Sequence, residues 1–269
     1  MSESYPSTIA VIGAGIMGEA LLNALIASGI SPRAITVSEK REMRSNELKA
    51  KYGVNIADLK ENVEKSDAIL LVVKPQDMSA VLTEIKPYLV DRTLLISIAA
   101  GKKIKFVLDH VGESFPVIRV MPNTPALVGE GMAAMSIGSY VTDSQKNFVK
   151  SFLQATGQVV EIDESLQDAV TAVSGSGPAY FFAFVEAMVA AGAKLGLSED
   201  VATELTVQTI IGAAKLLATT GKSAKELREN VTSPHGTTAA ALASFEQSGL
   251  NEIVAKAMTA AHVRSQELA

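Results

Sequence analysis

The chain has 269 residues, a formal net charge of −5 and no cysteine. This length allows one or two domains with a large core, and 48% hydrophobic against 20% charged residues excludes a disordered chain. The acidic balance argues against a broad nucleic-acid or anionic-membrane surface, because both require clustered Lys and Arg. Without cysteine there are no disulfides, thiolate nucleophiles or Cys-ligated metals. His110, His235 and His262 are scattered along the chain, so we expect no metal site.

The mean hydropathy of +0.24 raises the question of a membrane span. The longest apolar candidate, residues 181–197, is interrupted by Glu186 and Lys194 and falls short of the ~20 apolar residues that a span needs. The first eight residues include Glu3 and Pro6 and no basic residue, unlike a secretory signal. We therefore expect a soluble protein of a reducing compartment, the cytoplasm, with no membrane partner.

The first part of the chain alternates short apolar runs with helical patterns. The apolar runs predict strands at residues 9–12, 34–37, 54–56, 68–73, 94–98, 117–121, 132–137 and 159–162. Helices are predicted between them at residues 16–28, 42–51, 76–86, 103–109 and 144–155. Apolar strands that alternate with helices indicate parallel pairing with both faces of the sheet covered.

The pattern changes near Asp163, after which only helices are predicted. They cover residues 179–195, 199–218, 224–229, 238–247 and 252–267. Ser198 and Ser223 stand where helices begin, and Gly196, Gly221 and Gly249 where helices end. We predict an α/β Rossmann-like domain at residues 1–163 and an all-α domain at residues 164–269. The apolar faces of these Ala-rich helices favour packing between subunits, although packing within one chain is the alternative.

A glycine-rich turn follows the first strand and opens a helix: Gly13-Ala14-Gly15-Ile16-Met17-Gly18. In this strand–turn–helix context the motif predicts dinucleotide binding. Gly13 permits the tight turn, Gly15 lets the backbone approach a pyrophosphate, and Gly18 lets the helix pack on the strand. The free N–H groups at the helix start then face the phosphates.

The end of the second strand carries residues of both charges. Glu39 lies ~20 residues after the glycine loop, where an acid binds the ribose of NAD. Ser38, Lys40 and Arg41 are suited instead to the 2′-phosphate of NADP. The residues themselves leave this choice open.

Ligands of open α/β sheets bind at the carboxyl ends of the strands. Three further strand ends carry unusual residues: Val73-Lys74-Pro75, Ala99-Ala100-Gly101 and Met121-Pro122-Asn123-Thr124-Pro125. Lys74 is a candidate acid or phosphate contact, or simply an exposed lysine. Asn123 is a candidate partner for a nicotinamide amide or for a loop carbonyl.

Two loops of the helical half precede helices. The first is Ser174-Gly175-Ser176-Gly177-Pro178, which helix capping and close packing largely explain. The second is Thr232-Ser233-Pro234-His235-Gly236-Thr237-Thr238, where hydroxyls and N–H groups at a helix start suit a small carboxylate. His235 is a candidate general acid, but a lone loop histidine is more often merely exposed.

Taken together, these motifs resemble those of pyrroline-5-carboxylate reductases. The resemblance rests on the glycine loop, on Val73-Lys74-Pro75-Gln76, on the segment from Arg119 to Pro125, and on the Ser174 and Thr232 motifs. The combination in this order is specific, and the last two motifs discriminate most. The resemblance implies reduction of 1-pyrroline-5-carboxylate to L-proline with NAD(P)H, NADP(H) being favoured and NAD(H) an alternative. It also implies a helical dimerisation domain, with dimers or a decamer of five dimers.

The resemblance also implies roles for individual residues. The cofactor-binding residues would be Ile12, Gly13, Ala14, Gly15, Ile16, Met17, Gly18, Ser38, Lys40, Val72, Val73, Lys74, Pro75, Ala99, Ala100, Gly101, Met121, Pro122 and Asn123. The substrate-binding residues would be Ser233, Gly236, Thr237, Thr238 and Thr171. Thr238 would be catalytic, donating to or orienting the ring nitrogen while a hydride passes directly to the imine carbon.

Two residues depart from the family pattern. The family usually has glycine where His235 stands, and often asparagine near Leu59 for a ribose contact that Leu59 cannot make. Other oxidoreductases remain alternatives. A β-hydroxyacid dehydrogenase needs a lysine acid in the second half, for which Lys194 and Lys215 are candidates outside any motif. A broader imine reductase or a nicotinamide-binding sensor without turnover would share the glycine loop.

Overall fold

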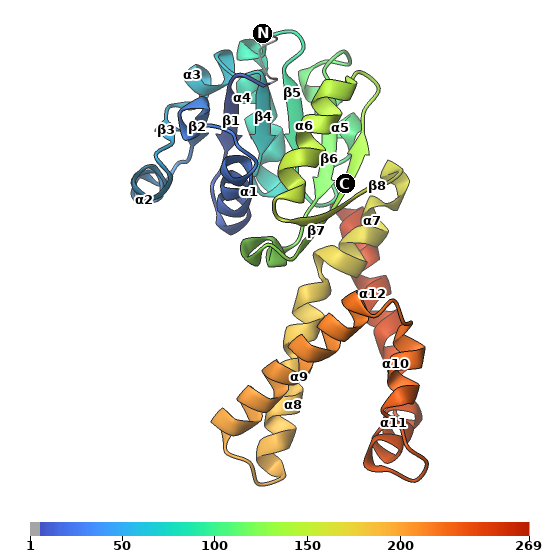
Figure 1. Ribbon diagram of the computed structural model, residues 1–269. Coiled ribbons are helices and arrows are strands. Elements are labelled where there is room, and N and C mark those ends of the chain that lie inside the picture. Colours follow the sequence, from blue (N-terminus) through green and yellow to red (C-terminus); the bar gives the residue numbers. More distant parts are fainter. Residues whose placement is uncertain (1–5, 269) are drawn as a thin grey trace. The chain divides into compact units, whose positions relative to one another are not determined.

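The computed structural model describes residues 6–268. They form two compact units (Figure 1). Of the described residues, one unit contains 6–176 together with 261–268, and the other is Gly177–Ala260. Helix α12 (Leu250–Glu267) begins in the second unit and ends in the first.

An eight-stranded sheet forms the centre of the first unit, in the order β3-β2-β1-β4-β5-β6-β7-β8. The strands are β1 (Ile9–Ile12), β2 (Ile35–Ser38), β3 (Asn55–Ile56), β4 (Ala68–Leu71), β5 (Leu94–Ser97), β6 (Val117–Met121), β7 (Gly131–Ile137) and β8 (Gly157–Glu161). Strand β1 lies in the middle and pairs in parallel with β2 on one side and β4 on the other. The order therefore reverses at β1, and a ligand crevice is expected at the carboxyl ends of these strands.

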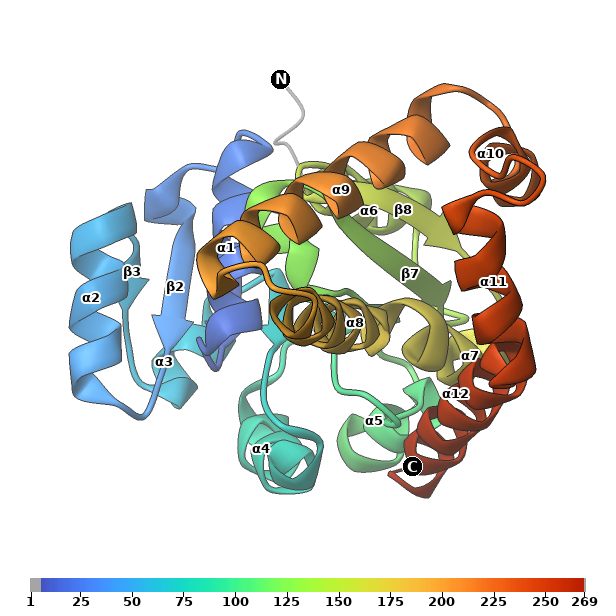
Figure 2. The same ribbon diagram turned by 90° about the horizontal axis from the view of Figure 1, so that it is seen from below.

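Helices cover both faces of the sheet. Figure 2 shows α4 (Met78–Ile85) and α5 (Ile104–Val111) on one side of the strands, and α1 (Ile16–Ala27) and α6 (Asp143–Gln154) on the other. Alternate residues of β1 enter two separate cores. Ile9 and Val11 pack with the α1 and α6 side chains, whereas Ala10 and Ile12 pack with those of α4 and α5. Burial on both faces explains why the strands are apolar throughout.

The prediction of parallel pairing is confirmed for the other strand pairs and is wrong for one. Strand β7 pairs antiparallel with β6, although β8 then pairs in parallel with β7. Only the short 3-10 segment Thr124–Val128 and a turn connect β6 to β7. A parallel neighbour would need a crossover of a dozen or more residues, so this connection returns the chain antiparallel.

Two further helices of the first unit flank the end of the sheet. Helix α2 (Glu42–Tyr52) lies where it was predicted, and α3 (Leu59–Glu64) was not predicted. Helix α3 is one and a half turns of mostly polar sequence, too short for periodicity to reveal. Its start is fixed by Asp58, whose carboxylate accepts a hydrogen bond from the N–H of Glu61 at 2.8 Å.

The predicted loop at residues 174–178 is wrong, because the chain there is helical. Helix α7 (Gln167–Val170) continues through a π-helical segment, Thr171–Gly175, into α8 (Gly177–Lys194). The widened π turn contains Ser174 and Gly175, and the single bend residue Ser176 joins it to α8. Such insertions are frequent at functional sites.

The second unit is helical throughout the residues that the structure describes. It contains most of α8, with α9 (Glu199–Thr219), α10 (Ala224–Asn230), α11 (Thr237–Gln247) and the first part of α12. Ser198 and Ser223 accept hydrogen bonds from the N–H groups three residues on, which confirms both predicted N-caps. The expected α/β part followed by an all-helical part is likewise confirmed.

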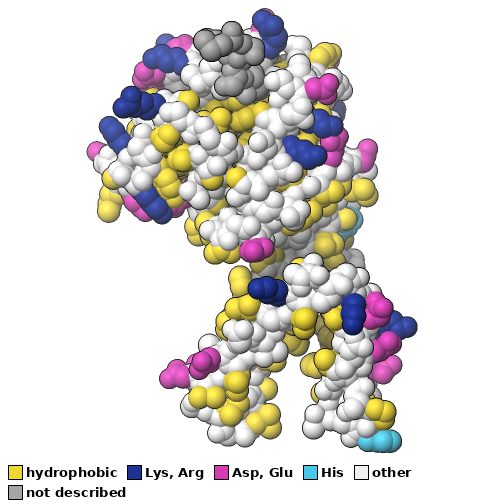
Figure 3. Space-filling model, in the orientation of Figure 1, with side chains coloured by type: hydrophobic (Ala, Val, Ile, Leu, Met, Phe, Trp, Pro, Cys, Tyr) yellow, Lys and Arg dark blue, Asp and Glu magenta, His cyan; other side chains and the backbone are white. Residues whose placement is uncertain are grey.

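Large apolar side chains of the helical unit are exposed. On the face drawn in Figure 3, hydrophobic side chains gather over these helices. The most exposed on α8 and α9 and the turn between them are Phe181, Phe182, Leu195, Leu205, Ile211 and Leu216. Exposed apolar patches of this kind mark surfaces that another molecule covers.

One described helix, α9, is long and apolar enough to cross a membrane by length and composition alone. Its mean hydropathy over 18 residues is 1.3, and 11% of that window is buried. Two acids, Glu199 and Asp200, lie in its first turn. A single helix of this kind is weak evidence for a span, since helices of protein interfaces have the same composition.

Candidate functional site

The glycine loop joins β1 to α1, and its three glycines have different surroundings. Gly13 has a φ of +84°, and a Cβ there would lie 2.7 Å from the carbonyl oxygen of Val72. A Cβ on Gly18 would lie 2.7 Å from the carbonyl oxygen of Gly13. The fold itself therefore requires Gly13 and Gly18. Around Gly15 there is no atom within 4 Å of a Cβ position, which leaves open space above the loop.

This open space belongs to a cleft of about 790 Å³ in the first unit. The cleft lies at the carboxyl ends of β1, β2 and β4, where the strand order reverses. Of the predicted cofactor residues it brings together Ile12, Gly13, Ala14, Gly15, Ser38, Lys40, Val72, Val73 and Lys74. Glu39, Arg41 and the departing residue Leu59 also line it. The other predicted cofactor residues are not among the described residues that line it.

The carboxylate of Glu39 is fully engaged by the protein. Its Oε2 accepts a hydrogen bond from the N–H of Ala14 at 3.0 Å, and its Oε1 accepts from Nε of Arg41 at 2.9 Å. The side chain and backbone of Arg41, together with the Ala14 N–H, lower the pKa of Glu39 to about 2. Both carboxylate oxygens of Glu39 therefore already accept hydrogen bonds from groups of the protein.

Ser38 and Lys40 differ in whether their side chains already have hydrogen-bond partners within the protein. The hydroxyl of Ser38 donates to the carbonyl oxygens of Ala57 and Asp58, at 3.1 and 3.2 Å, and accepts from Nδ2 of Asn62 at 2.9 Å. Lys40 is exposed, and no hydrogen bond or ion pair joins its ammonium group to another described residue. Among these two, Lys40 is the group available to a ligand phosphate.

A second carboxylate, Glu19 on α1, is the centre of a charged cluster beside the loop. Its Oε1 accepts from Nζ of Lys51 and from the hydroxyl of Tyr52, both at 2.8 Å, and its Oε2 pairs with Arg44. The hydrogen bonds from Lys51, Arg44 and Tyr52 lower the pKa of Glu19 to about 2. The cluster joins α1 to α2.

Glu19→Gln is expected to lower the free energy of unfolding at pH 7 by about 2 kcal/mol. The folded pKa of Glu19 is about 2, below the value of ~4.3 for an unfolded chain. Its carboxylate therefore stabilises the fold above pH ~4.5, and that contribution is lost as the pH falls toward 2. Urea unfolding at pH 7, 4 and 2.5 should show the difference between wild type and variant shrinking over this window. Glu113→Gln, at an exposed carboxylate after α5, is the control and should change little at any pH.

The loops after β5 and β6 continue the same edge of the sheet. Asn123 is buried and its amide is used internally: Oδ1 accepts from the N–H of Met132 at 2.8 Å, and Nδ2 donates to the carbonyl oxygen of Ser174 at 3.1 Å. Met121 packs closely against Gly175 of the π-helical segment. Through these two hydrogen bonds Asn123 fixes the β6 loop against the π turn.

Lys74, at the end of β4, begins the 3-10 segment Pro75–Asp77 and is exposed. Ala99, Ala100 and Gly101 follow β5 and lead toward α5.

Thr171 is buried in the π-helical segment, and its hydroxyl donates to the carbonyl oxygen of Gln167 at 2.9 Å. In this structure the Thr171 hydroxyl is thus bonded within its own helix.

The predicted substrate loop, residues 232–238, belongs to the helical unit and opens α11. Gly236 is the N-cap, and a Cβ there would lie 2.5 Å from Oγ of Ser233, so a larger residue would displace the Ser233 hydroxyl. Thr237 and Thr238 lie in the first turn of α11, and neither hydroxyl has a hydrogen-bond partner among the described residues. Free N–H groups and free hydroxyls therefore coincide at one helix start, as an anion site requires.

His235, at the position where the resemblance implies glycine, has a φ of +61°. This is the left-handed region that glycine adopts without strain and other residues rarely occupy. The backbone therefore keeps a glycine-like conformation, and the substitution adds an exposed imidazole to the loop.

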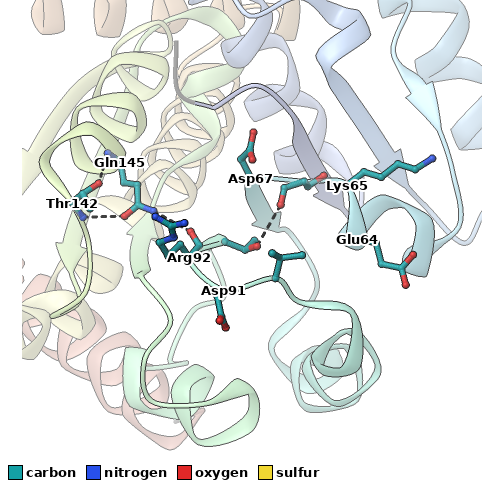
Figure 4. Close-up of a pocket in the computed structure, with 10 residues that line it drawn as sticks. Glu64, Lys65, Asp67, Asp91, Arg92, Thr142 and Gln145 are labelled. Carbon is teal, nitrogen blue, oxygen red and sulfur yellow. Dashed lines mark hydrogen bonds between the residues drawn. The ribbon is translucent and has the colours of Figure 1, made fainter. Parts of the chain in front are cut away.

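A second cavity in the first unit lies at the other edge of the sheet (Figure 4). Its volume is about 430 Å³, and it is lined by the residues that precede β4 and β5 and by the start of α6. Figure 4 shows Asp67, Asp91 and Arg92 around it, with Gln145 donating to the carbonyl oxygen of Arg92 at 3.3 Å. None of the predicted site residues lines this cavity. In the described part of the chain, no group of three His, Asp or Glu side chains is placed to hold a metal.

Sequence reasoning missed Arg44 and Asn62, which hold residues of the cleft. Asn62 bonds Ser38, and Arg44 donates to the carbonyl oxygen of Ala14 at 3.0 Å. Both lie on helices next to β2, and only the tertiary fold brings them to the loop. No local motif marks either residue.

Comparison with known proteins covers both parts of the chain. Residues 164–268 match the family model described as pyrroline-5-carboxylate reductase dimerisation, and residues 8–101 match that described as NADP oxidoreductase, coenzyme F420-dependent. A pyrroline-5-carboxylate reductase of Corynebacterium melassecola is 43% identical over 97% of this chain and 98% of its own length. One of Arabidopsis thaliana is 38% identical over 97% and 95%, respectively.

Solved structures agree with these relatives. A pyrroline-5-carboxylate reductase of Coxiella burnetii superposes with a TM-score of 0.90 at 36% identity, covering 98% of both chains. The Plasmodium falciparum pyrroline carboxylate reductase, solved with NADP bound, has a TM-score of 0.88 at 32% identity, again covering 98% of both. The likeness extends through the cofactor cleft, the π-helical junction and the helical half. The chain therefore belongs to the pyrroline-5-carboxylate reductase family.

Proposed function

We propose that this protein reduces 1-pyrroline-5-carboxylate to L-proline, the last step of proline biosynthesis, with NADPH as the hydride donor. The observation that carries the proposal is that relatives of this family match both halves of the chain over nearly its whole length. A match to the glycine loop alone would support any dinucleotide-binding enzyme. The helical half, with its hydroxyl-rich loop, is what narrows the reaction to this imine.

The preference for NADPH rests on the charges of the cleft. Glu39 is engaged by Ala14 and Arg41 and is not free to accept hydrogen bonds from ribose hydroxyls. Lys40 is exposed at the same place and suits a 2′-phosphate, with Ser38 beside it. The P. falciparum relative was crystallised with NADP, in agreement with this assignment. NADH remains the alternative donor.

The residues of the cleft fit a dinucleotide, because the space above Gly15 is open and the first N–H groups of α1 have no intrahelical acceptor. Residues 12–18 would hold the pyrophosphate, and residues 72–75 and 99–101 would line the groove. Met121, Pro122 and Asn123 would flank the nicotinamide, with the β6 loop held rigid by the amide of Asn123. When bound, NADPH supplies the hydride that reduces the imine carbon.

The substrate loop would position the imine for this transfer. The N–H groups at the start of α11, with Ser233, Gly236 and Thr237, would hold the substrate carboxylate. Thr238 would orient the ring nitrogen, its hydroxyl donating to the neutral imine nitrogen or accepting from the protonated one, with Thr171 nearby. A protonated imine is already electrophilic, so positioning supplies much of the catalysis, and no strong acid–base pair is required.

The enzyme would work as a homodimer whose helical halves cover one another. The exposed apolar side chains of α8 and α9, and the match to a dimerisation family, support this. The substrate would then lie between the nicotinamide of one subunit and the loop of its partner, and five dimers would form a decamer. Light scattering on the protein as it elutes from a size-exclusion column distinguishes the dimer from the decamer by a fivefold difference in mass.

Two other features belong to the proposal. The division at residues 163 and 164 separates the cofactor-binding part from the dimerisation and substrate-binding part, and the family match that begins at residue 164 supports it. The cytoplasm is the proposed location, since a chain without cysteine needs no oxidising compartment.

The test is to mix the purified protein with 1-pyrroline-5-carboxylate and follow nicotinamide absorbance with NADPH and NADH in parallel. We expect rapid oxidation and a higher kcat/KM for NADPH. A higher kcat/KM for NADH would mean that Glu39 binds the ribose of NADH and that Lys40 and Ser38 do not select NADPH. Binding of either cofactor by a folded dimer without oxidation would favour a sensor, or a reductase of another imine.

A further inference from the structure

The backbone of Ala14, in the glycine loop, is held by side chains at both its N–H and its carbonyl oxygen. Oε2 of Glu39 accepts from its N–H at 3.0 Å, and Nε of Arg44 donates to its carbonyl oxygen at 3.0 Å. The N–H of Gly13 donates to the carbonyl oxygen of Ser38 at 2.9 Å. The first two N–H groups of the loop are thus used by the protein, whereas those at the start of α1 remain for a ligand.

Arg44 is itself fixed in place and is not free to bind a phosphate. One terminal nitrogen pairs with Glu19, and the other lies 2.8 Å from Oε1 of Glu47. Glu19 is fixed in turn by Lys51 and Tyr52, both at 2.8 Å. The Arg44 side chain is only 16% exposed. All three nitrogens of Arg44 therefore have partners within the protein, and its planar fork holds them in one geometry.

We propose that Arg44 is a positioning residue for cofactor binding: with Glu39 it clamps the backbone of Ala14, and by holding the peptide between Ala14 and Gly15 it sets the orientation of the N–H groups that receive the pyrophosphate. This inference rests on the proposed function only in taking the loop as the phosphate site. It assigns to Glu39 a role other than binding ribose. It also explains why a salt-bridge cluster of α1 and α2 is built against the loop.

The inference is tested with two fragments of NADPH. Adenosine 2′,5′-bisphosphate carries a 5′-phosphate that reaches the loop, whereas 2′-AMP carries only the 2′-phosphate. Arg44→Met removes the donors at similar side-chain length. We expect it to weaken binding of adenosine 2′,5′-bisphosphate about tenfold and binding of 2′-AMP less than twofold. The KM for NADPH should rise, and kcat at saturating NADPH should stay within about twofold.

Arg33→Met is the matched control, because it removes the same charge from an exposed arginine at the opposite end of β2. It should change neither fragment's affinity. Arg44→Lys keeps the charge but not the fork, and should give an intermediate loss of about threefold for the bisphosphate alone. If Arg44→Met does not fold, as judged by circular dichroism, Arg44→Lys decides the question. Its loss of affinity for adenosine 2′,5′-bisphosphate is then compared with its loss for 2′-AMP.

Wild-type affinity of the Arg44 variants for adenosine 2′,5′-bisphosphate, or an equal loss for both fragments, would overturn the clamp. These are equilibrium measurements and do not depend on turnover. A wild-type protein that binds the fragments but oxidises no NADPH with 1-pyrroline-5-carboxylate would instead count against the proposed reaction and leave the clamp standing.

Discussion

Gly15→Ala is expected to weaken NADPH binding about 100-fold, or about 3 kcal/mol, while the protein folds as before. Gly15 has a φ of −66°, which alanine adopts freely, and a Cβ there would meet no protein atom within 4 Å. The methyl group would instead occupy the space through which the pyrophosphate approaches the backbone. Fluorescence titration with NADPH measures the affinity, and thermal unfolding measures the stability.

Gly18→Ala provides the contrast within the same loop. Its Cβ would lie 2.7 Å from the carbonyl oxygen of Gly13, so this substitution should destabilise the protein even without cofactor. The two alanines thus separate the role of a glycine in the fold from its role in binding. If Gly15→Ala bound NADPH as tightly as wild type, the pyrophosphate would not lie on this loop.

Thr238→Ala is expected to lower kcat with 1-pyrroline-5-carboxylate about 100-fold. Thr238 lies in the first turn of α11, and its hydroxyl has no hydrogen-bond partner in the described part of the chain. A hydroxyl without a structural partner is free to orient the ring nitrogen, and its loss should leave stability nearly unchanged. Steady-state kinetics at saturating NADPH provide the measurement.

Thr238→Ser retains the hydroxyl and should keep activity within about tenfold of wild type. The NADPH affinity of both variants should equal that of wild type, because the cofactor cleft lies in the first unit. An alanine variant with unchanged turnover and unchanged KM for the substrate would remove Thr238 from the mechanism.

The features predictable from sequence were those with a local physical cause. Gly13, Gly15 and Gly18 follow an apolar strand and open a helix, so the loop and its place at the sheet edge followed from spacing. Caps such as Ser198 and Ser223 act within one helical turn. The family followed from the order of the motifs, and the relatives confirm it.

The errors and omissions have tertiary causes. The antiparallel β6–β7 pair depends on how the short Thr124–Val128 connection turns, which apolar content does not encode. The glycines and serines of residues 174–177 look like a loop, but contacts of Ser174 with Asn123 and of Gly175 with Met121 hold these two residues in a π turn.

Which charged side chains around the cleft are paired, and which are free, depends even more on the fold. Glu39 occupies the position of a ribose-binding acid in the sequence, yet Ala14 and Arg41 use its oxygens. Arg44 reaches the loop from 30 residues away in the chain. No spacing rule predicts which of several acids and bases at a strand end will pair with one another and which will face a ligand.

The most direct test of the proposed reaction uses NADPH that carries deuterium in place of the transferred hydrogen. The protein is mixed with this cofactor and 1-pyrroline-5-carboxylate, and the product is analysed by mass spectrometry and NMR. Direct hydride transfer predicts L-proline with one deuterium on the ring carbon that was doubly bonded to nitrogen. Proline without deuterium, or no proline from a folded protein that binds NADPH, would contradict it.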